Sequence, residues 1–573
     1  MRQRCAISSV SSRPRLALGC LLVSVAILTV GCRPRALAGG GDVLAAVSPD
    51  PNATATATPF LPDGVQAVTT LTPLPSATVT REPAASAGLW VSPAVPAALM
   101  KAASGWGLPA ASSRETAGLR LQPLAPDAEP TSPQSLVIYA LIAAFPTASD
   151  GTTFAAVDSA WAGSGPPLVM AESTRQALTA LWGEAGPGAV RTVPSEALTD
   201  SLWQDRAAWG IIPFDELNPR LKVLSVEGQS PLHKDFDLGA YPLKLAFALD
   251  GDPDPSALEL PPTNRDPEKM TVLAMTGVTA LVRATAFKME QNGVLYPAQD
   301  IGPWLREADV THISNEVSFA EDCPPPDPNT GMMVFCSNPA YLALLKDIGT
   351  DVLELTGNHL IDYGARPFLY TLDLYRQNGI PYYAGGADAA EAQQALTLED
   401  HGNKLAFLGC NPAGPSGDWA TDTTPGSAFC GDYQWIKDSL ATLRAQGYVT
   451  VATLQYNEYY QSPPSETQAR DFGRLAEAGA TIVSGSQAHY PQTFAFQGDS
   501  FIHYGLGNLF FDQMDIPVPG TRREFVDRYV IYDGKVLSVE LLTAMLEDWS
   551  RPRPMTPEER AIFLQEIFSA SGW

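Results

Sequence analysis

The sequence predicts an α/β protein with a two-sheet α/β sandwich in its C-terminal half and a smaller α/β accessory domain before it. From about residue 270, short apolar segments alternate with amphipathic segments of helical length, the pattern of strand–helix units. The chain then becomes strand-rich, and Asp533-Gly534 is a dipeptide typical of hairpin turns. A length of 573 residues and a hydrophobic fraction of 45% leave room for more than one full-size core.

Composition divides the chain into segments. We predict a lipoprotein-type signal segment at 1–32, a disordered tether at 33–88, the accessory domain at 89–260, the sandwich domain at 270–545 and a C-terminal helix or tail at 546–573. The tether is rich in Ala, Thr, Pro, Ser and Gly, a composition that buries too little apolar surface to fold. A Pro- and Asp-rich stretch near 250–269 marks the boundary between the two domains.

The N-terminus has the features of an export signal. Four basic residues come first: Arg2, Arg4, Arg13 and Arg15. They precede an apolar stretch at 16–30 that is too short to span a bilayer comfortably. The stretch leads into Leu28-Thr29-Val30-Gly31-Cys32, which resembles a bacterial lipid-attachment sequence with Cys32 as the lipidated residue. A cleaved secretory signal and an uncleaved anchor are the alternatives. All three place the remainder outside the cytoplasm, and we expect a membrane-anchored lipoprotein at the bacterial cell surface.

The charge balance excludes one class of partner. Lys and Arg total 37 against 62 Asp and Glu, a formal net charge of -25. Nucleic-acid binding needs a basic surface, so we expect no nucleic-acid partner. Acidic surface is compatible with local cation binding.

Cysteine usage agrees with export. Outside the signal segment the cysteines are Cys323, Cys336, Cys410 and Cys430. An even number in an exported chain suggests disulfides, with three possible connectivities. We favour Cys323–Cys336 and Cys410–Cys430, because each pair closes a Pro- or Gly-rich loop. A Cys/His zinc site is less expected, since no C-x-x-C pair is present.

The accessory domain has a mixed pattern of strands and helices. Residues 135–145 and 167–171 are predicted as buried strands and 172–182 as an amphipathic helix. Further strand-like segments follow at 207–217, 220–228 and 239–249. This order resembles part of a periplasmic solute-binding α/β domain. An accessory domain without a ligand is the alternative.

The sandwich domain alternates regularly. Strands are predicted at 271–275, 309–314, 351–355, 404–409, 449–456 and 481–485. Helices are predicted near 339–348, 367–378, 432–445 and 465–478. In such folds functional residues lie just past the carboxyl ends of the strands.

Polar clusters follow these strands one after another. They are Thr276-Gly277-Val278, Ser314-Asn315-Glu316, Gly357-Asn358-His359 with Asp362, Gln455 to Glu458, Gly485 to His489, and His503 to Gln513. Together they are far more specific than any one of them. His312 and His503 lie within strands, where an imidazole is more often structural.

Order and spacing of the clusters resemble the CapA family, the poly-γ-glutamate capsule-biosynthesis proteins of the calcineurin-like metallophosphoesterase superfamily. The resemblance covers roughly residues 270 to 515. It lies in N-H-x-x-D-Y-G at Asn358–Gly364, G-I-x-x-x-x-G-G followed by E-A at Gly379–Ala392, Tyr504–Asn508, and Gly485–His489. It implies a metallophosphoesterase-like two-sheet fold and a metal-dependent phosphoesterase-like site.

Residue by residue, the resemblance assigns roles in this site. Glu316, Asn358 and His489 match metal ligands, and His359 matches the catalytic histidine, with Asp362 beside it. A metal would polarise a phosphoryl group and activate water, while the histidine stabilises the transition state or protonates the leaving group.

The sequence also departs from the family pattern. Val278 stands where the family has Asp, and Gln455 and Gln487 stand where it has His. Neutral amides are poor transition-metal ligands, so we do not expect an intact two-metal centre. A single ion on Glu316, Asn358 and His489 is expected instead, with Mn, Mg or Ca favoured over Zn by the oxygen ligands. A protein without metal is the alternative.

The remaining polar residues are candidates for substrate contacts: Glu458, Gln455, Gln487, Arg283 and Asn508. The first hypothesis is a CapA-like surface protein for capsule or extracellular polymer biosynthesis or anchoring, with a partly degenerate phosphoesterase-like site. The alternative is a non-catalytic lipoprotein that binds polymer or envelope glycan. In either case an extracellular anionic polymer or envelope glycan is the expected partner, and whether the protein is an enzyme stays open.

Overall fold

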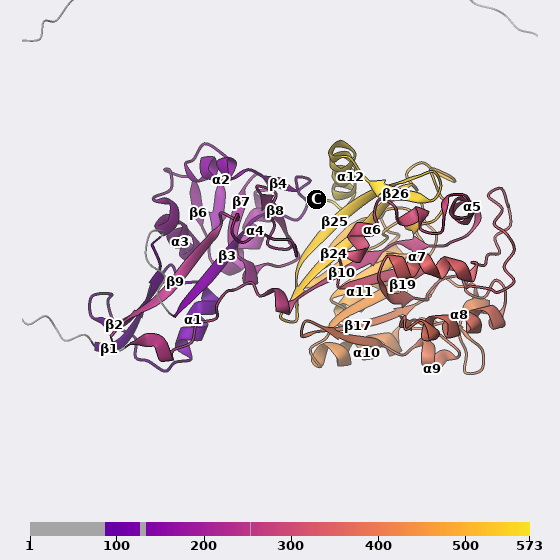
Figure 1. The fold of residues 1–573 in the computed structure, drawn as a ribbon, viewed down its shortest axis with the longest axis horizontal. Coiled ribbons are helices and arrows are strands. Elements are labelled where there is room, and N and C mark those ends of the chain that lie inside the picture. Colours follow the sequence, from indigo (N-terminus) through magenta and orange to yellow (C-terminus); the bar gives the residue numbers. More distant parts are fainter. Residues whose placement is uncertain (1–85, 126–132, 253) are drawn as a thin grey trace, which may run out of the picture. The chain divides into compact units, whose positions relative to one another are not determined.

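Alternating strands and helices build two sheets that pack face to face in the C-terminal half of the chain (Figure 1). The computed structural model describes residues 86–125, 133–252 and 254–573. These all belong to one compact unit, Thr80–Trp573. The signal segment with Cys32, and the tether up to residue 85, lie outside the described residues.

The accessory domain is built on a 9-stranded sheet whose main path runs β1-β2-β9-β3-β7-β5-β6, with β8 and β4 attached. Its strands are β1 (Ser86–Val91), β2 (Ala117–Pro123), β3 (Gln134–Ala144), β4 (Gly151–Thr152), β5 (Leu168–Met170), β6 (Val190–Thr192), β7 (Trp209–Pro213), β8 (Leu221–Val226) and β9 (Lys244–Gly251). Its helices are α1 (Ala97–Ser104), α2 (Phe154–Trp161), α3 (Glu172–Trp182) and α4 (Ser195–Gln204).

The first sheet of the sandwich is also 9-stranded, with the path β14-β13-β12-β10-β24-β25-β26 and with β11 and β23 beside it. Its strands are β10 (Met270–Thr276), β11 (Val278–Thr279), β12 (Val310–Asn315), β13 (Thr350–Glu354), β14 (Tyr382–Tyr383), β23 (Asn508–Phe510), β24 (Arg523–Tyr532), β25 (Lys535–Glu547) and β26 (Arg551–Pro554). Strands β10, β12, β13 and β14 are parallel, whereas β24, β25 and β26 are antiparallel.

The second sheet is 6-stranded in the order β16-β17-β19-β20-β22-β21. Its strands are β16 (Leu396–Asp400), β17 (Asn403–Cys410), β19 (Val449–Gln455), β20 (Ile482–Ser486), β21 (Phe494–Gln497) and β22 (Ser500–His503). A separate 2-stranded sheet pairs β15 (Gly385–Gly386) with β18 (Gly426–Ser427).

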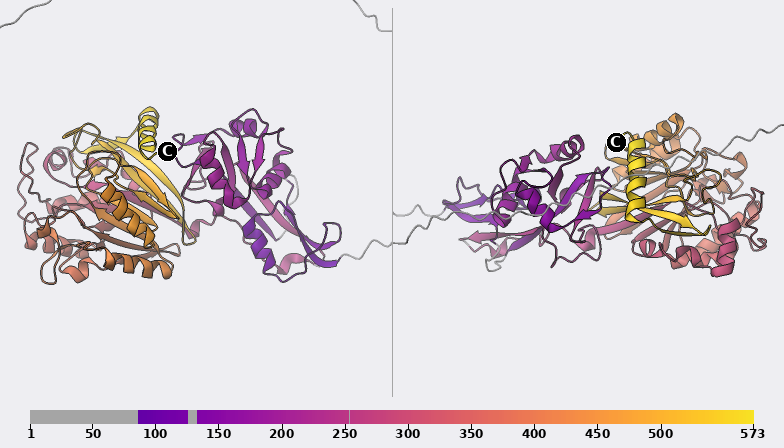
Figure 2. Two further views of the ribbon diagram at one scale, coloured as in Figure 1. Left: turned by 180° about the vertical axis from the view of Figure 1, so that it is seen from behind. Right: turned by 90° about the horizontal axis from the view of Figure 1, so that it is seen from above.

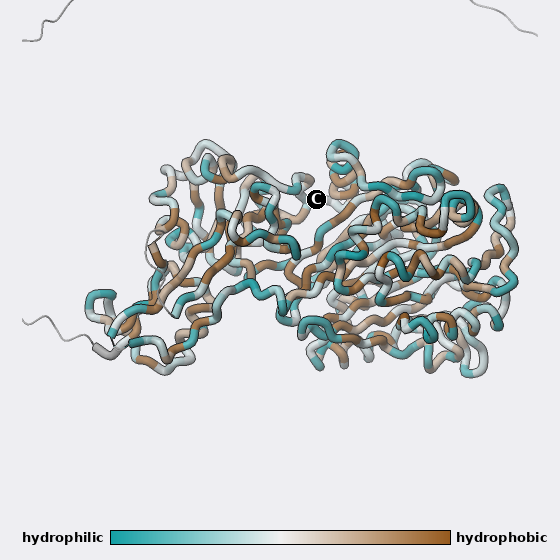
Figure 3. Tube along the Cα trace, viewed as in Figure 1, coloured by the Kyte–Doolittle hydropathy of each residue, from teal (hydrophilic) through white to brown (hydrophobic). Residues whose placement is uncertain are grey.

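Helices cover the outer faces of both sheets. They are α5 (Arg283–Asn292), α6 (Gly302–Arg306), α7 (Leu342–Asp347), α8 (Ala365–Gln377), α9 (Ala389–Ala392), α10 (Gln434–Ala445) and α11 (Glu466–Glu477). The last helix, α12 (Pro557–Ala570), adds its apolar residues to the core between the sheets. One hydrophobic core lies between the two sheets. Each sheet has a further core on its other face, between its strands and the helices that cover it. Hydrophobic residues run along the strands in Figure 3. This helix–sheet–sheet–helix order is the predicted two-sheet α/β sandwich.

The C-terminal helix, α12, begins with a capping box. Thr556 accepts a hydrogen bond from the Glu559 N–H, and the Glu559 side chain bonds back to the Thr556 N–H, with Pro557 at the first helical position. Phe563, Leu564 and neighbouring apolar residues then join the core between the sheets, and Figure 2 shows α12 against the C-terminal strands.

Glu524 is an unusual residue for the interior of a sheet. It lies on β24 with no exposed surface, and neither carboxylate oxygen has a hydrogen-bond partner among the described residues. Burial raises the pKa of Glu524 well above its ordinary value, because water no longer stabilises the charged form.

We expect Glu524→Met to stabilise the protein at pH 8 by about 2 kcal/mol, since an unpaired buried polar group costs about 1–3 kcal/mol. The folded state keeps the proton that the unfolded chain releases above about pH 4.3. Glu524 therefore lowers stability as the pH rises, and the substitution flattens this slope. Urea unfolding between pH 5 and pH 8 measures both effects, with exposed Glu259→Met as the control. Equal slopes in the variant and the wild type would show that Glu524 does not hold a proton.

Candidate functional site

Three side chains meet at the carboxyl ends of the parallel strands. Glu316 follows β12 and is buried, and one of its oxygens, Oε1, lies 3.9 Å from Nε2 of His359 and 3.9 Å from Nε2 of His489. These distances are too long for hydrogen bonds. The other oxygen, Oε2, has no hydrogen-bond partner in the part of the chain that the structure describes. A cation would supply the partner that this buried carboxylate oxygen lacks.

Gly357 permits this approach. A Cβ added to Gly357 would lie 2.5 Å from the backbone oxygen of Glu316 and 2.6 Å from its Cα. Only glycine therefore lets the turn after β13 pass so close to the residue that follows β12. The Gly-Asn-His turn and Glu316 are thus brought together by the backbone itself.

Asn358 joins the two sheets of the sandwich. Its Oδ1 accepts a hydrogen bond of 3.1 Å from Nε2 of Gln455, which ends β19 in the second sheet. Gln455 in turn accepts a bond of 2.6 Å from the Ser486 hydroxyl at the end of β20. This chain of bonds fixes the amide orientation of Gln455 and leaves the second lone pair of Asn358 Oδ1 for another partner.

His359 is held from behind by Asp362. The two are joined at 2.7 Å between Nδ1 and Oδ2, and Asp362 also accepts the Phe335 N–H at 2.7 Å. Nδ1 therefore carries the proton in the neutral ring, and Nε2 faces Glu316. Burial alone would lower the pKa of His359, but the bond to Asp362 and the charge of Glu316 raise it above its ordinary value.

His489 is oriented in the same way by Asn508. Asn508 donates from Nδ2 to the Thr521 carbonyl at 3.3 Å, so its Oδ1 faces His489 Nδ1 at 2.8 Å. The lone pair of His489 is thereby placed on Nε2, toward Glu316, which is the tautomer that binds metal ions.

The backbone around His489 is strained. Gln487 and His489 have φ angles of 69° and 49°, in the left-handed region that side-chain-bearing residues rarely adopt. Such conformations cost about 1–3 kcal/mol each and gather at functional sites. Gln487 Oε1 is buried and has no hydrogen-bond partner within the described ranges.

The first family carboxylate is replaced by a packed side chain. Val278 has no exposed surface and lies on β11, paired with Ser314 of β12 and Asn508 of β23. It lies among the site strands but offers no ligand atom.

Asp418 belongs to the site although sequence reasoning did not select it. It is buried in the loop between Cys410 and Cys430, and its Oδ2 lacks a partner among the residues described. Burial, with the Asp362 carboxylate in electrostatic range, raises the pKa of Asp418 to about 7. Two cysteines around a Gly- and Pro-rich segment were the only sequence signal near it.

The structure forms the two disulfides that the sequence favours. Cys323–Cys336 closes the loop that contains Phe335, and Cys410–Cys430 closes the loop that contains Asp418. Both loops therefore border the site.

Two predicted substrate residues lie in a neighbouring cavity. Arg283, at the start of α5, is paired with Asp512 through its Nη2 and, at 3.2 Å, through its Nε. Glu458 is exposed and lines the same cavity as Arg283. In the described structure, neither forms a hydrogen bond or ion pair with Glu316, His359 or His489.

The two strand histidines are structural. His312 and His503 have no exposed surface, and they contact Tyr383 at 2.8 Å and Asp527 at 2.6 Å respectively. Burial lowers the pKa of His312 to about 3, so its ring is neutral.

The residues around Glu316 fit one divalent cation. Glu316 supplies a buried carboxylate, Asn358 an amide oxygen, and His489 an imidazole Nε2 that lies 3.9 Å from Glu316 Oε1. This mixed oxygen and nitrogen donor set suits Mn or Mg better than an all-nitrogen or sulfur set would.

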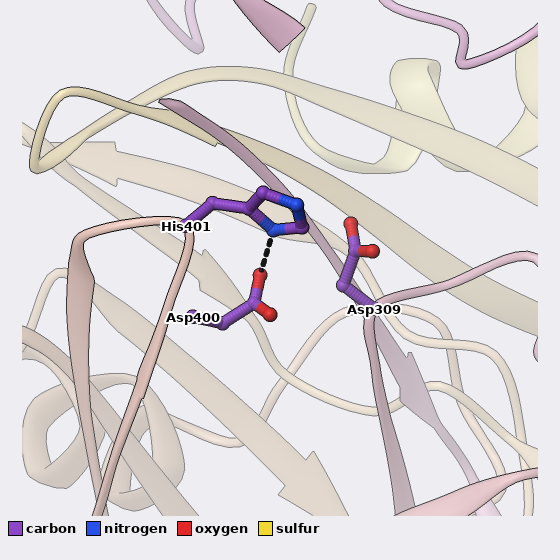
Figure 4. A group of neighbouring side chains, drawn as sticks. All are labelled: Asp309, Asp400 and His401. Atoms are coloured by element: carbon purple, nitrogen blue, oxygen red, sulfur yellow. Dashed lines mark hydrogen bonds and ion pairs between the residues drawn. The ribbon is translucent and has the colours of Figure 1, made fainter. Parts of the chain in front are cut away.

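A second group with metal-ligand atoms lies elsewhere (Figure 4). Ligand atoms of Asp309, Asp400 and His401 lie within 4.8 Å of one another. These carboxylates already have partners, since Asp309 is paired with Lys234 at 2.5 Å and Asp400 with His401 at 2.6 Å. The group lies before β12 and at the end of β16, away from the strand ends that carry Glu316.

Comparison with known proteins identifies the sandwich. Residues 272–513 match the protein-family model described as "Bacterial capsule synthesis protein PGA_cap". A capsule biosynthesis protein CapA from Bacillus anthracis is 24% identical over 300 residues, covering 52% of this chain and 72% of the relative. Residues 272–513 are a CapA-family domain. The resemblance predicted from the strand-end motifs is confirmed.

Another relative shows how far the match extends. The PGA biosynthesis protein CapA of Bacillus subtilis (strain 168) is 23% identical over 227 residues, 39% of this chain and 59% of the relative. The chain thus spans less than two thirds of this relative. The matched residues cover the sandwich as far as β23, the accessory domain lies before them, and β24 to α12 follow them.

Among solved structures, a Haemophilus influenzae NAD nucleotidase overlaps with a TM-score of 0.30 at 12% identity, covering 52% of this chain and 56% of that one. The fold of the CapA-family domain is assigned from its own sheet order and not from this overlap. No helix in the described ranges is long and apolar enough to cross a membrane.

Proposed function

We propose that the protein acts in the biosynthesis or anchoring of a capsule or other extracellular polymer, as a cell-surface lipoprotein held by Cys32. We further propose that its CapA-family domain is a single-metal phosphoesterase-like hydrolase. The match of residues 272–513 to capsule synthesis proteins supports the polymer role.

One observation carries the hydrolase proposal. His359 and His489 direct their Nε2 atoms at the same oxygen of a buried carboxylate, each from 3.9 Å. Asp362 orients the ring of His359, and Asn508 orients the ring of His489, each through a hydrogen bond to Nδ1. A core that only needed packing would not contain two oriented imidazoles around an unsatisfied carboxylate.

The residues have distinct roles in this proposal. Glu316, Asn358 and His489 would hold the ion, which supplies Lewis-acid polarisation of a phosphoryl oxygen and activation of water. In its protonated form, which the bond to Asp362 and the charge of Glu316 favour, His359 donates the Nε2 proton to the leaving oxygen and keeps the Nδ1 proton. Gln455 keeps Asn358 turned toward the site.

Metal analysis of the full chain tests the proposal. After incubation with Mn, Mg, Ca or Zn and desalting, we expect about one ion per chain, with manganese or magnesium preferred, and hydrolysis of bis(p-nitrophenyl) phosphate. Glu316→Gln should remove the ion, whereas Asp309→Asn, in the other ligand group, should leave it bound. No bound metal and no hydrolysis after adding manganese would reject the enzyme and favour a non-catalytic polymer-binding protein.

A further inference from the structure

A cavity of about 690 Å³ lies beside the candidate site. Segments far apart in sequence line it: the start of α5, the disulfide loop at 328–333, the loop after β19, the loop after β23, and Trp549. Arg283 connects the cavity to the site, because its guanidinium stacks on Phe335 at 5.2 Å and on Phe511 at 4.8 Å. These two rings in turn contact His359 and His489, at 4.7 Å and 5.0 Å between ring centroids.

About half of the residues that line the cavity are apolar or aromatic. Phe287, Tyr460 and Trp549 supply aromatic surface, and Met333 and Ile516 add aliphatic surface that is 59% and 60% exposed. Aromatic walls with a few placed polar groups are typical of sites for organic ligands, because the walls bind the ligand's apolar face.

The cations in this lining are already paired. Arg283 bonds to Asp512, which also accepts the Ala284 N–H at 2.9 Å, and Lys288 is paired with Asp548 at 2.5 Å. Arg283 and Lys288 are the only basic residues among those that line the cavity. A polyanion would therefore find no unpaired positive charge there, and it would meet Glu458.

Two acceptors in the lining lack a full set of partners. Gln513 is 8% exposed and donates from Nε2 to the Tyr460 hydroxyl at 3.2 Å, while its Oε1 has no partner in the described structure. Tyr460 donates its hydroxyl proton to Glu458, whose other carboxylate oxygen stays available. A ligand that donates hydrogen bonds and carries no negative charge matches these two acceptors, and the Asn329, Thr330 and Trp549 side chains can donate to its own oxygens.

We propose that this cavity is a carbohydrate subsite that holds a neutral sugar unit of the polymer next to the Glu316 cluster. The C–H face of a sugar ring would pack on Trp549 and Phe287, and its hydroxyls would donate to Gln513 Oε1 and Glu458. As a subsite for the substrate it rests on the proposed function, but its capacity to bind sugar does not depend on catalysis.

Calorimetric titration of the full chain tests the subsite. The probes are chitotetraose, cellotetraose and maltotetraose, with a poly-γ-glutamate oligomer as the anionic competitor. We expect at least one neutral tetrasaccharide to bind, and Gln513→Ala and Trp549→Ala to weaken it about tenfold, the effect of one lost contact to a buried acceptor. Phe429→Ala, an exposed aromatic outside the cavity, is the matched control.

The outcomes separate this proposal from the hydrolase. Binding that persists in His359→Ala but weakens in Gln513→Ala supports the subsite even where no hydrolysis is found. Binding of poly-γ-glutamate without any tetrasaccharide overturns it, as does binding of none of the probes. Tetrasaccharide binding unchanged by both cavity variants also overturns it, because the sugar would then lie elsewhere.

Discussion

Replacing His359 with alanine is expected to slow metal-dependent phosphodiester hydrolysis by about 100- to 10,000-fold, the range for loss of a general acid–base group. The reason is its placement: Asp362 fixes Nδ1 at 2.7 Å and turns Nε2 toward Glu316. Because His359 is not among the proposed ligands, bound metal should stay at about one ion per chain. Rate and metal content measured on the same sample therefore separate a proton donor from a ligand.

His401→Ala is the matched control for this change. His401 also pairs with a neighbouring carboxylate, Asp400, but it lies in the other ligand group. It should leave the rate unchanged. Full activity in His359→Ala would remove this residue from the mechanism. Loss of the metal together with the rate would reassign it as a ligand.

Removing the Cys410–Cys430 disulfide by a double alanine substitution is expected to lower the free energy of unfolding by about 3 kcal/mol, given its sequence separation of 20 residues. The bond reduces the number of conformations open to the unfolded chain. In the folded chain it closes the loop that contains Asp418. Chemical unfolding of the variant and the wild type under oxidising conditions measures the difference.

The second disulfide provides the comparison. Cys323–Cys336 has a sequence separation of 13 residues, so its removal should cost a similar free energy. Its loop contributes Met333 to the cavity and ends beside Phe335. We therefore expect this variant to lose sugar binding, and the Cys410–Cys430 variant to retain it. Equal effects of both variants on binding would mean that the loops are not independent.

Strands and helices of the sandwich were predictable because their burial imposes a period on the sequence. The strand expected at 351–355 is β13, Thr350–Glu354, and the helix expected near 465–478 is α11, Glu466–Glu477. Strand-end motifs were equally informative, since parallel strands bring their carboxyl ends to one edge. Glu316 and His359 are 43 positions apart in the sequence, and their side chains approach to 3.9 Å in the structure.

The residues whose positions the sequence did not predict lie in loops. Asp418 lies in a segment without periodicity, and only the folded Cys410–Cys430 loop brings it near His359. Glu458 follows β19 and was expected near the strand-end residues around Glu316, but it lines the neighbouring cavity instead. Nothing in the sequence around Trp549 or Gln513 indicates that they share a cavity, because tertiary packing alone joins those segments.

The two disulfides make the stability and activity of the protein depend on oxidation. Both disulfides close loops that border the site, one beside Phe335 and the other around Asp418. The two bonds differ in their relation to the cores: Cys323 and Cys336 lie outside the cores of the first sheet, whereas Cys410 and Cys430 belong to the core of the second sheet. A newly made chain in a reducing compartment would therefore lack a covalent link in that core as well as the closed loop beside Phe335. Protein produced in a reducing cytosol is expected to be less stable and less active until its thiols are oxidised.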